Sequence, residues 1–216
     1  MTESTLRALS GLRDPASLQW YVIPLLAIVF YIYVTEVSRA RGSGDWDAIV
    51  AGAAVFGADF LNETINSWIM ALSGRAALWT TPGPSALKTL VGWNIEIMFM
   101  FAILGIIWQR SLSGKAGARL FGLGEGWFFA LAYSLICVVV ELVLNAGGLL
   151  VWDWPFWNRS LTAVLPIFVF GYLWFFAWAI FATSRPTARG KALIAALPYG
   201  VAVLLDLVAV AAGIRY

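Results

Sequence analysis

Four acidic residues lie inside stretches of sequence that are otherwise apolar enough to form membrane helices, and these are Glu63, Glu96, Glu141 and Asp206. No Lys, Arg or His shares the hydrocarbon with them. A carboxylate near the middle of a bilayer costs about 2.5–3.5 kcal/mol on insertion scales, so such residues usually mark a functional site. Counted along the predicted helices at 1.5 Å per residue, all four lie roughly 10–14 Å below one membrane surface. We therefore predict that they share one polar site.

A polar stripe surrounds the first of these acids. Asp59, Asn62, Glu63 and Asn66 are spaced i, i+3, i+4 and i+7, which places them on one helical face. Such a face is expected to point into a bundle, away from lipid. The predicted catalytic set is Glu63, Asp206, Glu96, Glu141 and Asp59, and the predicted substrate-binding set is Trp93, Asn62, Asn66, Asn94, Asn145, Tyr199 and Trp154.

The chemistry available to this site is that of carboxylic acids, amides and aromatic rings. Burial and like charge both favour the protonated form of a carboxyl, which can then donate a proton. The chain has 12 Trp, 14 Phe and 7 Tyr, and aromatic faces stabilise cations. These groups suit protonation of an alkene or epoxide in a neutral, apolar substrate. Because the chain has no His, the sequence excludes Ser-His-Asp and Cys-His catalysis and imidazole metal sites, and we expect neither a cofactor nor a metal.

Two other hypotheses stay open beside an enzyme. Protonated acids bonded to Asn side chains can hold membrane helices together for about 0.6–2 kcal/mol, which would describe a non-catalytic subunit or a lipid-binding module. Intramembrane carboxyls also occur in proton- or cation-coupled transporters. We rank the enzyme first, the module second and the transporter third. The net charge of +2 gives no reason to expect nucleic acid as a partner, whereas a membrane lipid or isoprenoid is expected.

The elements that must position these residues follow from the composition. The 216 residues are 61% hydrophobic and 12% charged, against about 25% charged in soluble domains. We predict an all-α, polytopic integral-membrane bundle of about six transmembrane helices, with seven as the alternative. Residues 1–19 form a polar N-terminal segment, and residues 20–216 form the single bundle. The predicted spans are 20–38, 47–72, 87–108, 126–148, 162–183 and 192–214.

Basic residues set the expected orientation. They gather in the loops after the first, third and fifth predicted helices, and the positive-inside rule places such loops in the cytoplasm. The protein is then expected in a cell or endoplasmic-type membrane with both termini outside. The opposite side carries a Trp-rich stretch at 151–158, which suits an interfacial belt or a lid over the site. The basic residues are Arg39, Arg41, Arg110, Lys115, Arg119, Arg185, Arg189 and Lys191.

The chain resembles the small membrane-integral terpene cyclases of meroterpenoid pathways. That family has an essential Glu on its second helix, in an Asn-x-x-Trp-Glu motif, and an essential Asp late in the chain. The matching positions here are Glu63 and Asp206. The chain departs from the family in having Asn62 in place of the Trp, and in its six predicted helices where the family has seven. The resemblance implies acid-initiated isoprenoid chemistry with Glu63 and Asp206 as proton donor and acceptor or cation stabiliser.

Overall fold

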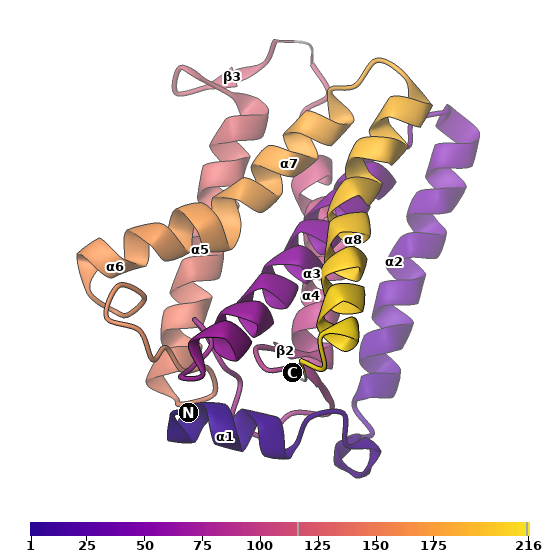
Figure 1. The fold of residues 1–216 in the computed structure, drawn as a ribbon. Helices are drawn as coiled ribbons and strands as arrows, with labels where there is room; N and C mark the ends of the chain where they lie inside the picture. Colours follow the sequence, from indigo (N-terminus) through magenta and orange to yellow (C-terminus); the bar gives the residue numbers. More distant parts are fainter. Residues whose placement is uncertain (116, 215) are drawn as a thin grey trace.

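The computed structural model describes residues 1–115, 117–214 and 216, and Figure 1 shows their arrangement as a bundle of long helices. Among these residues, five helices are long and apolar enough to cross a membrane. A sixth, α4, is only 16 residues long and packs beside α3. The predicted all-α bundle is confirmed. The long helices are α2 (Val22–Ser43), α3 (Asp47–Ser73), α4 (Ile95–Arg110), α5 (Glu125–Ala146), the interrupted helix Leu161–Thr183 and α8 (Ala188–Ala211).

The N-terminal segment lies across one end of the bundle. Helix α1 (Glu3–Ser10) runs crosswise beneath the long helices in Figure 1 and is followed by the short 3-10 turn η1 (Pro15–Ser17). We call this the α1 end, and we call the opposite end, with the basic loops, the basic end. The Thr2 hydroxyl donates to the Asp153 carboxylate at 2.9 Å, and the Thr2 N–H donates to the Arg75 carbonyl at 2.9 Å. These bonds connect the start of α1 to the two long loops at this end, which are residues 74–87 and 147–160.

The predicted span 87–108 is wrong over its first eight residues. Strands β1 (Lys88–Leu90) and β2 (Trp93–Asn94) form an antiparallel hairpin there, and α4 begins only at Ile95. Turn chemistry explains the difference, because Gly92 lies in the hairpin turn and the Asn94 side chain accepts the Ile97 N–H at 2.9 Å as a helix N-cap. Glu96 is therefore the second residue of its helix, and does not lie nine residues inside it. A second hairpin, β3 (Arg119–Leu120) with β4 (Leu123–Gly124), lies at the basic end.

The fifth span is one helix with a widened middle. It consists of α6 (Leu161–Pro166), the π-helical stretch η2 (Ile167–Leu173) and α7 (Trp174–Thr183). Pro166 has no N–H to donate, so regular α-helical bonding is interrupted where η2 begins. Such π-helical turns are rare in proteins overall, and many of those that occur lie at functional sites.

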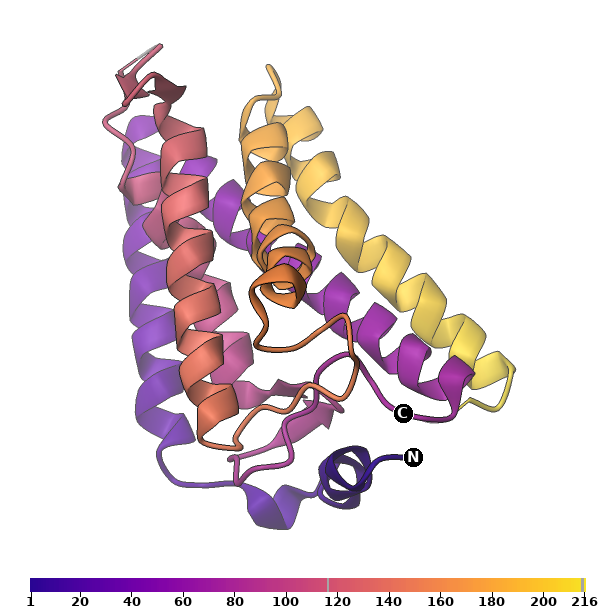
Figure 2. The ribbon, with the colours of Figure 1, turned by 90° about the vertical axis from the view of Figure 1, so that its left-hand side faces the viewer.

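Helix α3 is the centre of the bundle and packs against α4, α7 and α8. Its small buried residues, including Ala51, Gly52 and Ala54, allow these helices to approach closely. At the tightest crossing, a Cβ on Gly105 of α4 would collide with the backbone carbonyl of Ala51. Helix α8 diverges from α5 toward the α1 end, as Figure 2 shows.

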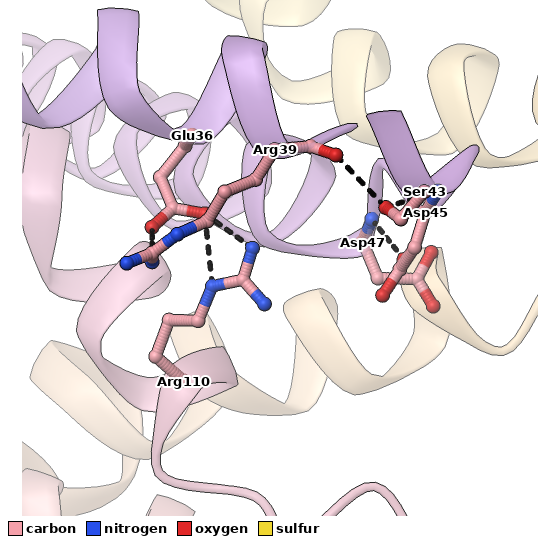
Figure 3. Close-up of polar contacts among 6 residues, drawn as sticks. All are labelled: Glu36, Arg39, Ser43, Asp45, Asp47 and Arg110. Carbon is pink, nitrogen blue, oxygen red and sulfur yellow. Dashed lines mark hydrogen bonds and ion pairs between the residues drawn. The ribbon is translucent and has the colours of Figure 1, made fainter. Parts of the chain in front are cut away.

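Ion pairs join the helices at the basic end. Glu36 of α2 is buried and lies between two guanidinium groups (Figure 3), accepting from Arg39 at 2.7 Å and from Nε of Arg110 at 2.8 Å. The contact with Arg110 joins α2 to α4. Asp47 and Lys191 form a second pair, which joins α3 to α8.

The helix crossing at Gly105 gives a test of the fold. Gly105→Ala should lower the free energy of unfolding by about 1–3 kcal/mol, because two backbones would have to separate. Gly200→Ala on α8 is the matched control, since nothing lies within 4 Å of its added methyl group. Thermal unfolding of both variants in detergent is the measurement. Equal melting temperatures for the two variants would contradict this packing.

Candidate functional site

A cavity of about 360 Å³ lies between α3, α4, α5 and the η2–α7 segment. Four acids line it. Helix α3 contributes Asp59 and Glu63, α5 contributes Glu141, and the first turn of α4 contributes Glu96. The structure thus brings together four of the five predicted catalytic residues. Within the described residues, no Lys or Arg lines this cavity, and most of its wall is apolar or aromatic.

The Glu63 carboxyl is held at one oxygen only. The side chain is 3% exposed, and the indole N–H of Trp79 donates to its Oε1 at 2.8 Å. Oε2 is buried and has no hydrogen-bond partner among the described residues. Two residues position the indole. A Cβ on Gly92 would lie 2.5 Å from the Trp79 ring, and the Asn66 side chain donates to the Trp79 carbonyl at 2.8 Å. Asn66 therefore fixes the loop that carries Trp79 and does not line the cavity.

Glu141 repeats this arrangement from the opposite wall. It is 6% exposed, its Oε1 accepts the indole N–H of Trp152 at 3.3 Å, and its Oε2 is buried without a described partner. An indole can only donate and carries no charge, so it can bond to the carbonyl oxygen of a neutral carboxylic acid without requiring the ionised form. An ionised carboxylate with one donor in an apolar cavity would be strongly disfavoured. The geometry suits two neutral acids whose hydroxyl oxygens face the cavity.

Asp59 and Trp93 form a third pair of this kind. The Trp93 indole donates to Asp59 Oδ2 at 2.8 Å, and both side chains are buried. Trp93 stacks on Phe60 with ring centroids 5.4 Å apart. Trp93 was predicted to line the pocket, but it lies behind the wall and reaches the site only through Asp59.

Glu96 lies at the α1 end of the cavity in a different environment. Its carboxylate accepts from the Tyr21 hydroxyl at 2.6 Å, the Ser85 hydroxyl at 2.9 Å and the Ala86 N–H at 2.8 Å. The bond to this carboxylate raises the pKa of Tyr21 above its usual value. Three donors suit an ionised carboxylate that fastens the 82–87 loop to α2, so Glu96 differs chemically from Glu63 and Glu141.

Asp206 does not join the other acids. Its Oδ1 accepts the Tyr216 hydroxyl at 2.9 Å, and it lines a separate pocket with Arg13 and Leu90 between α8 and the α1 segment. The prediction that Asp206 shares the site of the other acids is therefore wrong. Helix α8 diverges from α5 toward the α1 end (Figure 2), so a residue of α8 at the same depth as the cavity acids lies to one side of them. Tyr199, predicted to bind the substrate, donates to the Ala53 carbonyl at 2.8 Å and lines a groove between α3 and α8.

The remaining predicted binding residues have mainly structural contacts. Asn62 lines the cavity, but its amide donates to the backbone of η2 at 2.9 Å. Asn94 caps α4, and Asn145 donates to the backbone of the following loop at 2.9 Å. The Trp154 indole donates to the Ala77 carbonyl at 3.0 Å, which joins the two long loops.

Sequence reasoning missed Trp79, Trp152 and Tyr172 at the site. The two Trp residues lie in loops, where an interfacial belt was a sufficient explanation for them. Tyr172 lines the cavity from the π-helical stretch, whose altered turn a regular helical pattern does not reveal. The absence of basic residues near the acids means that neutral donors must satisfy them, but this observation alone does not single out the indoles.

Comparisons with known proteins agree with the membrane character of the fold. A protein from Archaeoglobus fulgidus, described as uncharacterized, is 38% identical over 193 residues, which cover 89% of each chain. No solved structure matches the chain. Residues 2–211 match the profile of a family described as an uncharacterized membrane protein family. The helices of membrane-spanning length and this match together identify a multi-pass integral-membrane protein, and the chain belongs to that family.

Proposed function

We propose that this protein is an integral-membrane enzyme that protonates an apolar lipid, of the isoprenoid type, with a buried carboxylic acid. The observation that carries the proposal is that Glu63 and Glu141 each have one buried oxygen without a hydrogen-bond partner among the described residues, in one mainly apolar cavity. A polar atom buried without a partner is costly, and at a cavity that could hold a ligand a catalytic role is one explanation for it. A substrate group that accepts the proton would supply the missing partner.

The proposed reaction needs no cofactor. The O–H bond of Glu63 breaks as its proton forms a C–H bond with an alkene carbon, and positive charge develops on the neighbouring substrate carbon. The Glu63 carboxylate keeps the Trp79 N–H as its donor. The cation then loses a proton to the Glu63 carboxylate, which gives a neutral isomer or ring and returns Glu63 to its acid form. Glu141 lines the same cavity, and its neutral carboxyl is placed to stabilise the cation as a dipole.

Aromatic side chains beside the acids suit the same chemistry. Phe101, Tyr172 and Phe175 all line the cavity. Phe101 stacks on Tyr172 at 6.2 Å and meets Phe175 edge-on at 5.5 Å, so the three rings form one continuous wall. Ring faces attract cations in a dry site, at about 2 kcal/mol or more when desolvated.

The proposed orientation puts this site in the outer half of the membrane. The loops of the basic end then face the cytoplasm, following the positive-inside rule. Glu141 lies five residues before the end of α5 on the side of the α1 end, which places the acids away from the cytoplasmic surface.

A lipid-binding module without chemistry is the second candidate. The bonds from Trp79 to Glu63 and from Trp152 to Glu141 fasten two loops onto α3 and α5, and a purely structural acid would also do this. Transport has less support, because toward the basic end the described cavity wall is formed by Leu104, Ile107, Tyr133 and Phe175, and the Tyr133 hydroxyl is already paired with Ser111. Beyond Asp59, the described residues that line the cavity on this side include no further charged side chain.

Replacing one acid tests the enzyme against the module. Lipids that copurify with wild type, Glu63→Gln and Asp206→Asn should be identified by mass spectrometry. Loss of a general acid slows such a step by about 10²–10⁴-fold, so Glu63→Gln should retain an unreacted precursor where wild type retains product. Asp206→Asn is the matched control, since it removes an acid on another transmembrane helix and outside the cavity, and should behave as wild type. The same lipid bound to all three proteins would reject catalysis in favour of binding.

The protonation state of Glu63 can be tested without a substrate. The infrared difference between wild type and Glu63→Gln should contain the carbonyl stretch of a protonated carboxylic acid. Trp79→Phe should move this band to higher frequency, because the bond to Oε1 is lost, whereas Trp152→Phe should leave it in place. A difference spectrum that contains only carboxylate bands would be incompatible with proton donation by Glu63.

A further inference from the structure

The cavity has an apolar mouth between α4 and α5. Met100 and Ile107, seven residues apart on α4, line the cavity and are also exposed on the outside of the bundle. Ile136 and Val140, four residues apart on α5, do the same, at 56% and 44% exposure. Each pair lies on one face of its helix, so the four side chains border a single opening. From Met100 to Ile107 the opening spans roughly 10 Å along α4.

The mouth lies along the middle of the helices. Within the described residues, the hydrogen bonds that join α4 and its following loop to α5 lie at the basic end. There the Ser111 and Tyr133 hydroxyls are 2.8 Å apart, and the Trp108 indole donates to the Gly126 carbonyl at 3.2 Å. Below these contacts, the facing side chains of the two helices are apolar and have no hydrogen bonds to keep them together.

The loop side of the cavity is covered. Trp79 and Trp157 both line it and stack with ring centroids 5.7 Å apart. Leu150, from the same loop as Trp157, completes this cover and is buried. A molecule approaching from water at the α1 end therefore meets stacked indoles, while a molecule in the bilayer meets an opening bordered by aliphatic side chains.

We propose that the substrate is a membrane-dissolved lipid that enters sideways between α4 and α5 and does not come from water. This inference rests on the proposed function, because it concerns the cavity that holds the acids. Cys137 and Glu141 lie one residue further along α5 than Ile136 and Val140, so the chain of such a lipid passes from the mouth directly to Cys137 and the Glu141 carboxyl. The lipid must accordingly be slender and uncharged over the part that enters, with its proton-accepting group inside that part.

The single cysteine of the chain offers a reporter for this route. Cys137 lines the cavity and is 8% exposed. In phosphatidylcholine vesicles, phenylmercury should reach Cys137 from the bilayer, whereas its charged sulfonate analogue should react far more slowly. Val140→Trp and Ile136→Trp should each slow phenylmercury labelling by roughly tenfold or more, because a large side chain obstructs the mouth. Val139→Trp is the matched control, since Val139 is exposed on the same helix but does not line the cavity, and its rate should equal that of wild type.

The labelling result separates this inference from the proposed chemistry. Glu63→Gln should be labelled as fast as wild type even though its lipid content changes, because entry requires no proton transfer. Equal labelling by phenylmercury and its sulfonate would show entry from water and overturn the inference. So would equal rates for Val140→Trp, Ile136→Trp and Val139→Trp. If labelling follows the expected pattern while Glu63→Gln binds the same lipid as wild type, the lateral route stands and catalysis fails.

Discussion

The hydrogen bond from a tryptophan indole to a buried carboxyl is the interaction on which this structure depends. Among the described residues it occurs three times, from Trp93 to Asp59, from Trp79 to Glu63 and from Trp152 to Glu141. A Lys or Arg partner would hold the acid in its ionised form, and a hydroxyl or amide could itself accept a hydrogen bond from the O–H of the acid. An indole does neither, because it carries no charge and has no acceptor. It holds the carboxyl in place without requiring the ionised form.

This choice of donor also explains why the α1 end is so rich in tryptophan. The indole body is apolar enough for the membrane interface, and its N–H is free to reach inward. The loops must then fold back over the bundle to deliver these N–H groups. The Asn66 side chain binds the loop that carries Trp79, and Gly92 leaves room for the Trp79 indole. The N-terminal segment binds the loop that carries Trp152, through Asp153. Contacts that do not involve the acids themselves therefore decide where the donors of Glu63 and Glu141 lie.

The sequence was sufficient for the helices, but it placed Glu96 too deep in its helix and could not give the directions in which the acids point. Apolar runs long enough to span the bilayer predict membrane helices well, because the bilayer sets their length. The start of α4 was missed since a hairpin and an Asn cap lie within a run that remains mostly apolar. Spacing on α3 correctly grouped Asp59 and Glu63, because they share one helix. Asp206 was misplaced because tilt and rotation between helices come from packing, which no single helix encodes. The contacts of Trp79 and Trp152 depend on the paths of two loops, which the sequence pattern does not predict.

The π-helical stretch makes the cavity wall sensitive to chain length as well as to residue type. A π-turn holds one more residue than the α-turn it replaces, so deleting a single residue from Ile167–Leu173 would restore regular bonding. Because the widened turn already absorbs that residue, α6 and α7 would keep nearly the same faces after the deletion, and the change would fall on the stretch itself. Gly171 and Tyr172 could not then both keep their places in the wall. The shape of this cavity can therefore change in two ways, by substitution of its lining or by the loss of one residue from this stretch.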